Sequence, residues 1–249
     1  MAGLVYDDKF YSSQSGPSLR SAFAVVPILI DLIRPNSVVD VGCGVGTWLT
    51  AFRENGVADI LGIDGEYVDR KRLQIPEECF LSMDLSNPIS QINRRFDLAL
   101  CLEVAEHIPE RSAGSLIDFI TALSPVVFFS AAIPGQGGAG HVNEQWPDYW
   151  CRHFTDRGYQ ILDVIRPKIW NITQVEPWYC QNSFLYIQGA QLHCYPELLE
   201  SGSRPAHLPL RVVHPELFRR FVSLEYVQSK SMVRELLARL QRKVFGKTL

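Results

Sequence analysis

The sequence predicts an α/β protein in which an open, mostly parallel sheet is covered by helices on both faces. Residues 38–41 form a short run rich in β-branched side chains, which is typical of a buried parallel strand. A glycine-rich turn and a helix-forming stretch follow directly. Further short apolar runs then alternate with helical stretches, as they do in sheets covered on both faces.

The chain offers seven candidate strands, and the long, aromatic-rich connection lies between the last two. No internal repeat or low-complexity segment interrupts the series. A helix ahead of the sheet is expected to cover it. We expect strands at residues 38–41, 60–63, 79–82, 96–101, 126–130, 159–165 and 183–187, and helices at residues 19–33, 47–54 and 112–123.

The turn after the first strand is the most informative motif. Gly42, Gly44 and Gly46 form a G-x-G-x-G turn in which backbone can approach a ligand closely. A dinucleotide fingerprint would place its third glycine at the position that Thr47 occupies. Asp40 ends the strand with a carboxylate that would repel a pyrophosphate and attract a cationic ligand.

This turn resembles the first motif of the class I S-adenosylmethionine-dependent methyltransferases. The resemblance implies that S-adenosylmethionine is the cofactor, that the glycine turn with Cys43 wraps its methionine part, and that Asp40 helps to hold its amino group. It also implies a Rossmann-like, mostly parallel seven-stranded sheet whose last strand is reversed. The matching run is Asp40-Val41-Gly42-Cys43-Gly44-Val45-Gly46.

Two later strands also end in carboxylates that suit the rest of this cofactor. Asp64, followed by Gly65, would accept hydrogen bonds from both ribose hydroxyls; the alternative is a solvated Asp ahead of a turn glycine. Asp84 would accept from the adenine amino group, with Met83 and Leu85 lining the ring. An ordinary helix N-cap is the other interpretation of Asp84.

The segment after the fourth strand, Leu102-Glu103-Val104-Ala105-Glu106-His107, resembles the family's acidic stretch ending in Glu-His. If the resemblance holds, Leu102 and Glu103 border the cofactor, and His107 either approaches it or makes a structural hydrogen bond. We expect Glu106 to be a surface carboxylate.

A loop with four glycines in six residues follows the fifth strand, at the edge where parallel sheets bind ligands. His141 and Glu144 come directly after it and are the candidates for contact with the acceptor. We predict that His141 is a general base, that Glu144 orients it or replaces it, and that His107 is the rival. Asn143 and Glu144 could instead only cap the next helix. Gly-His-x-Asn-Glu-Gln-Trp-Pro (residues 140–147), with Trp178-Tyr179-x-Gln181-Asn182, resembles a methyltransferase subgroup common beside glycan and secondary-metabolite pathways.

Several site types are not expected. The six cysteines form no C-x-x-C pair, no Asp/Asp/Asn triad is apparent, and we predict no metal site. The Asn/Asp-Pro-Pro-Tyr motif of amide and nucleobase N-methyltransferases is absent, which disfavours those acceptors. An apolar stretch at residues 22–33 is too short for a transmembrane segment and contains Pro27 and Asp31. No signal peptide is apparent, and a cytoplasmic location is expected.

The charge divides the chain into two parts. Residues 204–249 carry ten Lys and Arg against three Glu, so the remaining residues hold a net charge of −10 within the total of −3. An acidic body disfavours nucleic acid as the substrate. We predict a methyltransferase domain at residues 1–195 and a basic helical extension at residues 196–249. Its amphipathic face around Leu236 and Leu240 would pack on the domain, form a homodimer or touch an anionic surface weakly.

The favoured function is transfer of a methyl group to a small polar acceptor, and the favoured acceptor group is a hydroxyl of a sugar or secondary metabolite. The alternatives are N-methylation of a small molecule, an NAD-dependent oxidoreductase on a similar sheet, and a non-catalytic module that binds the cofactor. Thr47 and Asp40 argue against the oxidoreductase.

Overall fold

The computed structural model describes residues 8–88, 92–200 and 210–223 of the chain. It forms two compact units, Met1–Val212 and Val213–Leu249. The first holds the whole sheet, and the described part of the second is a helical stretch at residues 215–223. The predicted domain boundary after residue 195 stays a prediction. The predicted amphipathic face around Leu236 and Leu240 lies outside the described residues.

The first unit is built on a seven-stranded sheet of order β3-β2-β1-β4-β5-β7-β6. Five strands pair in parallel, and β7 is antiparallel to both of its neighbours, β5 and β6. The predicted fold class and reversed last strand are therefore confirmed. The strand order reverses between β1 and β4, which is the place where open α/β sheets bind ligands. The strands are β1 (Ser37–Val41), β2 (Asp59–Asp64), β3 (Phe80–Ser82), β4 (Leu98–Leu102), β5 (Val126–Ser130), β6 (Tyr159–Leu162) and β7 (Phe184–Gln188).

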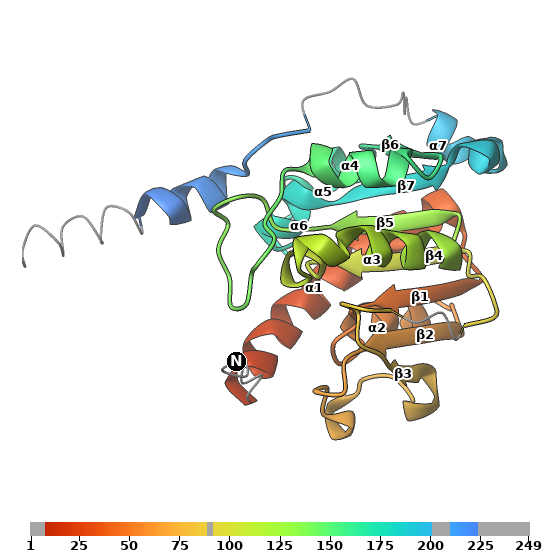
Figure 1. Cartoon of the computed structure of the whole chain (residues 1–249), viewed down its shortest axis with the longest axis horizontal. Coiled ribbons are helices and arrows are strands. Elements are labelled where there is room, and N and C mark those ends of the chain that lie inside the picture. The colour runs from red at the N-terminus through yellow and green to blue at the C-terminus, as the bar shows by residue number, and fades with distance from the viewer. Residues whose placement is uncertain (1–7, 89–91, 201–209, 224–249) are drawn as a thin grey trace, which may run out of the picture. The chain divides into compact units, whose positions relative to one another are not determined.

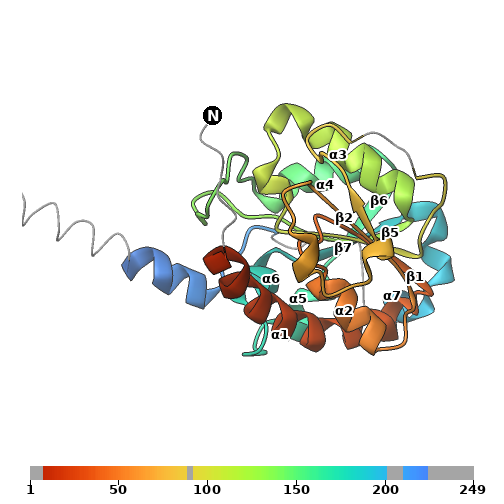
Figure 2. The ribbon, with the colours of Figure 1, turned by 90° about the horizontal axis from the view of Figure 1, so that it is seen from below.

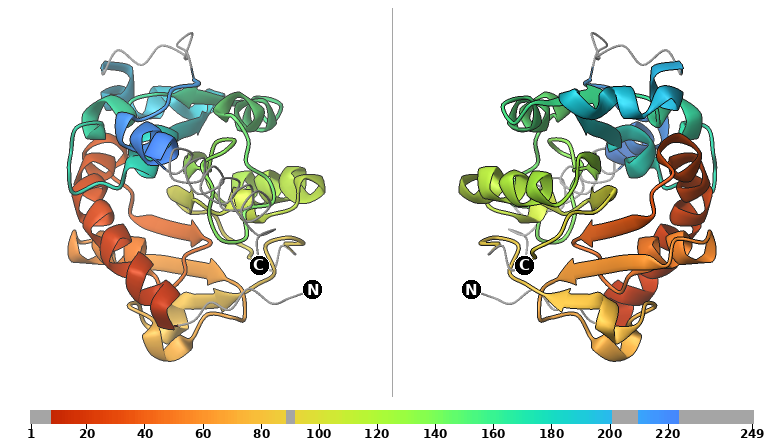
Figure 3. Two further views of the ribbon diagram at one scale, coloured as in Figure 1. Left: turned by 90° about the vertical axis from the view of Figure 1, so that its left-hand side faces the viewer. Right: turned by 90° about the vertical axis from the view of Figure 1, so that its right-hand side faces the viewer.

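Helices cover both faces of the sheet, as Figures 2 and 3 show from below and from the two ends. One face carries α1, α2, α5, α6 and α7, and the other carries α3 and α4. Alternate residues of each strand point to opposite faces, so Val38 joins the first core and Val39 the second. The helices are α1 (Asp8–Ile33), α2 (Thr47–Glu54), α3 (Glu110–Leu123), α4 (Pro147–Thr155), α5 (Arg166–Ile169), α6 (Pro177–Asn182) and α7 (Pro196–Glu200).

The predicted strands are all present, and three are shorter than expected: β4 begins at Leu98, two residues late, and β3 and β6 are also shortened. The 3₁₀ turn Glu77–Cys79 takes the first predicted residue of β3. The sixth strand ends at Leu162, three residues early, because the chain turns there toward α5. All six cysteines are free thiols in the structure.

The first helix differs most from its prediction, because α1 spans 26 residues and continues through Pro17 and Pro27. Its stretch Gly16–Ile33 is long and apolar enough to cross a membrane by length and composition, so the expectation that this segment is too short was wrong. The same helix packs Ala22, Val26 and Leu29 into the core of the first unit with no exposed surface. That packing gives it the predicted role of a covering helix.

Candidate functional site

The glycine turn joins β1 to α2 at the point where the strand order reverses. Gly42, Gly44 and Gly46 have φ values of 86°, 54° and 85°, in the left-handed region that other L-residues rarely adopt. The Gly42 amide donates to the Ile63 carbonyl at 2.7 Å, which ties the turn to the end of β2. The sequence G-x-G-x-G therefore produces a backbone loop fixed against the neighbouring strand.

The absence of a Cβ serves two purposes in this turn: close internal packing at two glycines and open space beside the third. A Cβ at Gly42 would come within 2.2 Å of Val104, and one at Gly46 within 2.9 Å of Ile75, so these glycines allow close internal packing. A Cβ at Gly44 would meet nothing within 4 Å. Space therefore lies open beside the middle glycine, and the loop there suits a ligand laid against the backbone.

Asp64, at the end of β2, is directed at the same loop. Its carboxylate accepts from the amide of Gly44 at 2.6 Å and from the amide of Gly65 at 2.7 Å, and Tyr67 donates its phenol to it. Burial raises its pKa, and the Tyr67, Gly44 and Gly65 bonds oppose that rise. The residue is only 4% exposed, so the alternative of a solvated Asp is wrong.

Asp40 lies in the body of β1 and is 2% exposed. Burial, and then the nearby Asp64 carboxylate, raises its pKa to about 7. Two buried carboxylates thus stand close to the glycine turn. Uncompensated negative charge in such a place favours a cationic ligand. These residues fit S-adenosylmethionine: Asp40 for its ammonium group, the turn for its methionine part and Asp64 for its ribose.

The residues predicted to hold adenine follow β3. Met83 is half-buried and Leu85 is buried, whereas the Asp84 side chain is exposed. Asp84 accepts from the amide of Ser86 at 2.9 Å and from its hydroxyl at 2.7 Å. These bonds close a local turn, and no helix begins at Asp84 in the structure, so the alternative of a helix N-cap is not confirmed; the adenine role of Asp84 stays a prediction.

A polar network lies across the reversal point, at the ends of β4 and β5. Glu103 adopts a left-handed φ of 55°, a strained conformation that non-glycine residues tend to hold at functional sites. Its carboxylate accepts from Gln136 at 3.0 Å and from Asn182 at 3.1 Å. Burial raises its pKa, and the Asn182, Ser130 and Gln136 bonds together with nearby His141 oppose the rise.

Glu106 contradicts its prediction, since this expected surface carboxylate has no exposed area. It lies in the 3₁₀ turn Ala105–His107, and its carbonyl accepts from the amides of Val142 and Asn143 at 2.8 and 3.0 Å, so the later loop covers it. Burial, and then the neighbouring Glu103, raises its pKa well above the usual range. Within the described chain, neither carboxylate oxygen has a hydrogen-bond partner.

The glycine-rich loop brings His141 beside His107, with ring centroids 4.8 Å apart and the planes nearly perpendicular. Nδ1 of His141 lies 2.8 Å from Glu144. The carboxylate of Glu144 also accepts from the amides of Gly135 and Gly137, both at 2.7 Å. Glu144 therefore orients His141 and folds the loop through three hydrogen bonds, and its alternative role as the base stays a prediction.

The structure thus gathers the predicted residues into two groups, one on each side of the reversal point. Asp40, the glycine turn and Asp64 form the first, and Glu103, His107, His141 and Glu144 belong to the second. Sequence reasoning assigned no role to four further residues of the second group. Gln181 and Asn182 were part of the run that resembles the methyltransferase subgroup, and the signal of the other two was polarity at or after the end of β5: Ser130 and Gln136.

Comparison with solved structures finds the same fold. KedS8, a sugar N-methyltransferase from Streptoalloteichus sp., superposes with a TM-score of 0.56 at 14% identity, covering 76% of this chain and 94% of that one. DesVI from Streptomyces venezuelae gives 0.54 at 14%, covering 72% and 95%. CalS10, an amino pentose methyltransferase from Micromonospora echinaspora, gives 0.53 at 14%, covering 76% and 100%. No curated protein matches this sequence.

The sequence profile described as "Methyltransferase domain" matches residues 20–164, which include the first six strands and the whole glycine turn. The oxidoreductase interpretation is therefore set aside. The match covers more than half of the chain and agrees with the sheet order and with the turn's geometry. This chain belongs to the methyltransferase domain family and is an S-adenosylmethionine-dependent methyltransferase.

Proposed function

We propose that this enzyme methylates a hydroxyl group on a small polar acceptor, such as a sugar or a secondary metabolite. The observation that carries the proposal is the second group: two imidazoles in contact, one held by a carboxylate, beside the buried Glu106. This group stands at the end of β4 and in the loop after β5, across the reversal point from the glycine turn.

The chemistry explains why such a group is useful. When bound, S-adenosylmethionine supplies an electrophilic methyl carbon. A neutral hydroxyl is a weak nucleophile, so its proton must be removed or its pKa lowered as the new bond forms. An ionised Glu144 carboxylate can only accept a hydrogen bond from His141, so Nδ1 of the imidazole is the donor. Nε2 then keeps its lone pair and can take the proton of the methyl acceptor.

The surrounding network suits a polar acceptor. Gln136, Gln181 and Asn182 are amides that bond to one another and to Glu103. Amide groups offer both donors and acceptors, which match the hydroxyls of a sugar. In-line alignment of the acceptor by such contacts lowers the barrier, and in well-oriented reactions alignment can supply about 7–11 kcal/mol.

N-methylation is the second candidate, because KedS8 is described as a sugar N-methyltransferase and CalS10 as an amino pentose methyltransferase. An amine with a free lone pair needs less help in losing its proton. The oriented His141 therefore favours the hydroxyl.

The free cysteines agree with a reducing compartment, and we propose the cytoplasm as the location.

Matched acceptors test the proposal. Calorimetry with S-adenosylmethionine and its demethylated product comes first, since a chain that binds neither cannot be assayed meaningfully. Sugars that differ only in carrying a hydroxyl or an amino group at one position are then compared by mass spectrometry. We expect the hydroxyl compounds to gain the methyl group. Methylation of the amino compounds alone would overturn the proposal, and cofactor binding without turnover across the panel would favour a binding module.

A further inference from the structure

Three side chains in the second group are arranged as metal ligands. One carboxylate oxygen of Glu106 and one ring nitrogen each of His107 and His141 all lie within 4.8 Å of one another. Ligand atoms around a single ion with bonds of about 2.0–2.2 Å stand roughly 3–4.4 Å apart. A small inward movement of these three side chains would therefore bring them to bonding distance.

The burial of this group demands a partner. Glu106 has no exposed area, and neither of its carboxylate oxygens makes a hydrogen bond of good geometry with the described residues, although the backbone of Glu106 and Ala132 and the Glu103 carboxyl lie close to it. The buried Nδ1 of His107 has no hydrogen-bond partner there either. A buried carboxylate that lacks both donors and a cation is costly, and Glu103 beside it adds to the cost. Among the unpartnered buried atoms of the described residues, those of Glu106 and His107 belong to neighbouring members of one cluster, and a shared ligand would satisfy them together.

We propose that Glu106, His107 and His141 bind a divalent first-row transition-metal ion. Two imidazole nitrogens and one carboxylate suit zinc, manganese, cobalt or iron, whereas magnesium prefers oxygen ligands. Three protein ligands leave further coordination positions open. The predicted absence of a metal rested on sequence spacing alone, and Glu106 had been expected at the surface.

The groups behind these ligands also have the arrangement of a metal site. Glu144 accepts a hydrogen bond from Nδ1 of His141 at 2.8 Å, which leaves Nε2 as the ligand atom. Carboxylates hold metal-binding histidines in this way, and they fix both tautomer and ring orientation. Gly138 allows the ring to lie where it does, because a Cβ there would come within 2.2 Å of Nε2.

The site deepens the proposed function and rests on it for its purpose. An acceptor hydroxyl that occupied an open position would have its pKa lowered by the ion. During transfer, the O–H bond breaks and its proton passes to water. The O–C bond forms, and the C–S bond breaks with its electron pair passing to sulfur. His141 would then act as a ligand and not as the base.

Metal binding by itself tests the site. The full chain is stripped with a chelator, dialysed and titrated with Co²⁺ by absorption spectroscopy and calorimetry. We expect one ion per chain with d–d bands of a site containing nitrogen ligands. Glu106→Gln, His107→Ala and His141→Ala should each weaken binding at least tenfold. Glu144→Gln, a positioning variant, should weaken it by about 10- to 100-fold.

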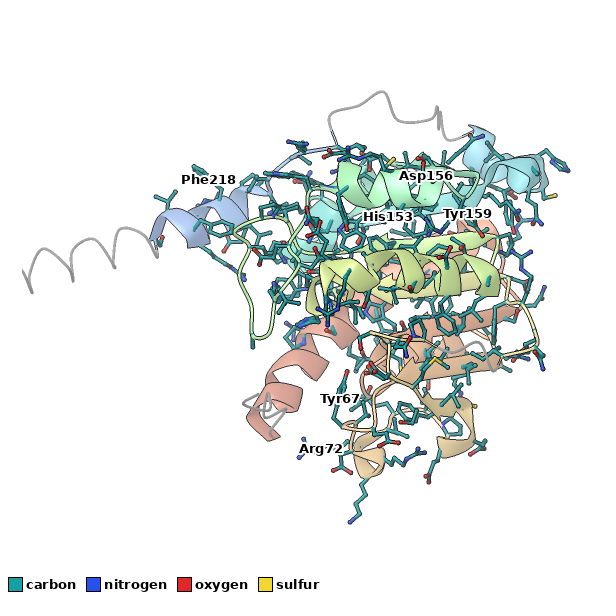
Figure 4. The ribbon with its side chains drawn as sticks, in the orientation of Figure 1. Tyr67, Arg72, His153, Asp156, Tyr159 and Phe218 are labelled. Carbon is teal, nitrogen blue, oxygen red and sulfur yellow. The ribbon has the colours of Figure 1, made fainter. Side chains whose placement is uncertain are left out.

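His153→Ala is the matched control, because this histidine lies on α4 among aromatic rings (Figure 4) and is not one of the three clustered ligands. It should bind Co²⁺ as the unaltered chain does. Each variant's fold is checked by circular dichroism and by its affinity for S-adenosylmethionine. A stripped, folded chain that binds S-adenosylmethionine but no Co²⁺ overturns the proposal, as does binding that survives all three ligand substitutions.

The outcome separates this inference from the proposed function. If hydroxyl methylation persists in the presence of a chelator and still requires His141, the proposed metal has no role in it and His141 is the base. Stoichiometric Co²⁺ binding combined with methylation of amines alone would keep the site and overturn the hydroxyl acceptor.

Discussion

The two groups of site residues, one on each side of the reversal point, differ in how their buried carboxylates are hydrogen-bonded. The first group (Asp40, the glycine turn and Asp64) forms the predicted cofactor side. There, Asp64 receives three hydrogen bonds, two of them from backbone amides of neighbouring turns. The second group, around Glu106, His107 and His141, forms the predicted acceptor side. There, Glu106 is also buried, and its carboxylate oxygens have no hydrogen-bond partner among the described residues. Asp64 therefore has its hydrogen-bond partners before a ligand arrives, whereas Glu106 lacks them among the described residues.

The difference follows from where each group comes from in the chain. The cofactor side is assembled from a strand, its turn and the end of the next strand, with Gly44 and Asp64 only 20 residues apart. The acceptor side joins the end of β4 to the loop after β5 and to α6; Asn182 lies 79 residues from Glu103. A locally encoded turn gives a rigid binding surface, and a long-range assembly can be retuned for different acceptors.

The largest expected effect comes from breaking the acceptor side alone. His141→Ala should lower kcat by about 10²–10⁴, the usual cost of losing a group that activates the nucleophile. Affinity for S-adenosylmethionine should survive, because His141 lies on the loop after β5 and not on the glycine turn. Steady-state kinetics and calorimetry on one preparation measure both quantities.

Val142→Ala is the control for this loop, since that side chain is 64% exposed and next in the chain. Near-normal turnover in His141→Ala with loss in His107→Ala would transfer the activating role to His107. A parallel loss of cofactor affinity in His141→Ala would show that the two sides are not separate.

Breaking the cofactor side should give a smaller effect of the opposite kind. Asp64→Ala removes the acceptor for the Gly44 and Gly65 amides and the predicted ribose contact. We expect affinity for S-adenosylmethionine to fall by about 1–3 kcal/mol in a chain that remains folded. Asp69→Ala, an exposed carboxylate on the same segment, should leave affinity unchanged. Calorimetry that finds equal affinities for both variants removes Asp64 from the site.

The pKa of Asp40 gives a pH-dependent prediction on the same side. Burial and Asp64 raise this pKa from 3.8 to about 7, so the folded chain holds a proton that the unfolded chain has lost. The stability gained from that proton is full below about pH 4 and disappears as the pH rises through 7. Between pH 6 and 8, the free energy of unfolding of the cofactor-free chain should fall by about 1.4 kcal/mol from this group.

Urea unfolding at both pH values measures the fall, and Asp40→Asn should abolish this part of it. The ammonium group of S-adenosylmethionine should offset the ionised carboxylate, so the stabilisation by the cofactor should be larger at pH 8. An Asp40→Asn chain with the same pH dependence as the unaltered chain would refute the assignment.

How much the sequence could predict follows the same division. The β1 strand and the glycine spacing are local signals, and they located the turn, Asp40 and Asp64 correctly in relation to one another. The helix α1 was predicted to begin late because Gly16 and Pro17 ordinarily mark a helix boundary. Packing of its apolar face on the sheet carries the helix through both prolines.

Glu106 shows what local reasoning could not reach. A Glu followed by a His near a strand end looks like a solvated turn, since carboxylates are seldom fully buried. Its burial depends on the loop some 36 residues later, whose Val142 amide bonds to the Glu106 carbonyl. Neither periodicity nor spacing encodes that contact, so the cluster with His107 and His141 is visible only in the folded chain.

The smallest expected effect concerns Tyr67, which lies on the segment after β2 together with Arg72 (Figure 4). The Tyr67 phenol donates to Oδ1 of Asp64, one of the two oxygens predicted to receive the ribose hydroxyls. A ligand must share or displace that bond. Tyr67→Phe should therefore tighten binding of S-adenosylmethionine by about 0.5–1 kcal/mol, the net worth of an ordinary hydrogen bond. Tyr149→Phe on α4 is the control. Weaker binding in Tyr67→Phe would instead mean that the phenol itself contacts the cofactor and completes the cofactor side.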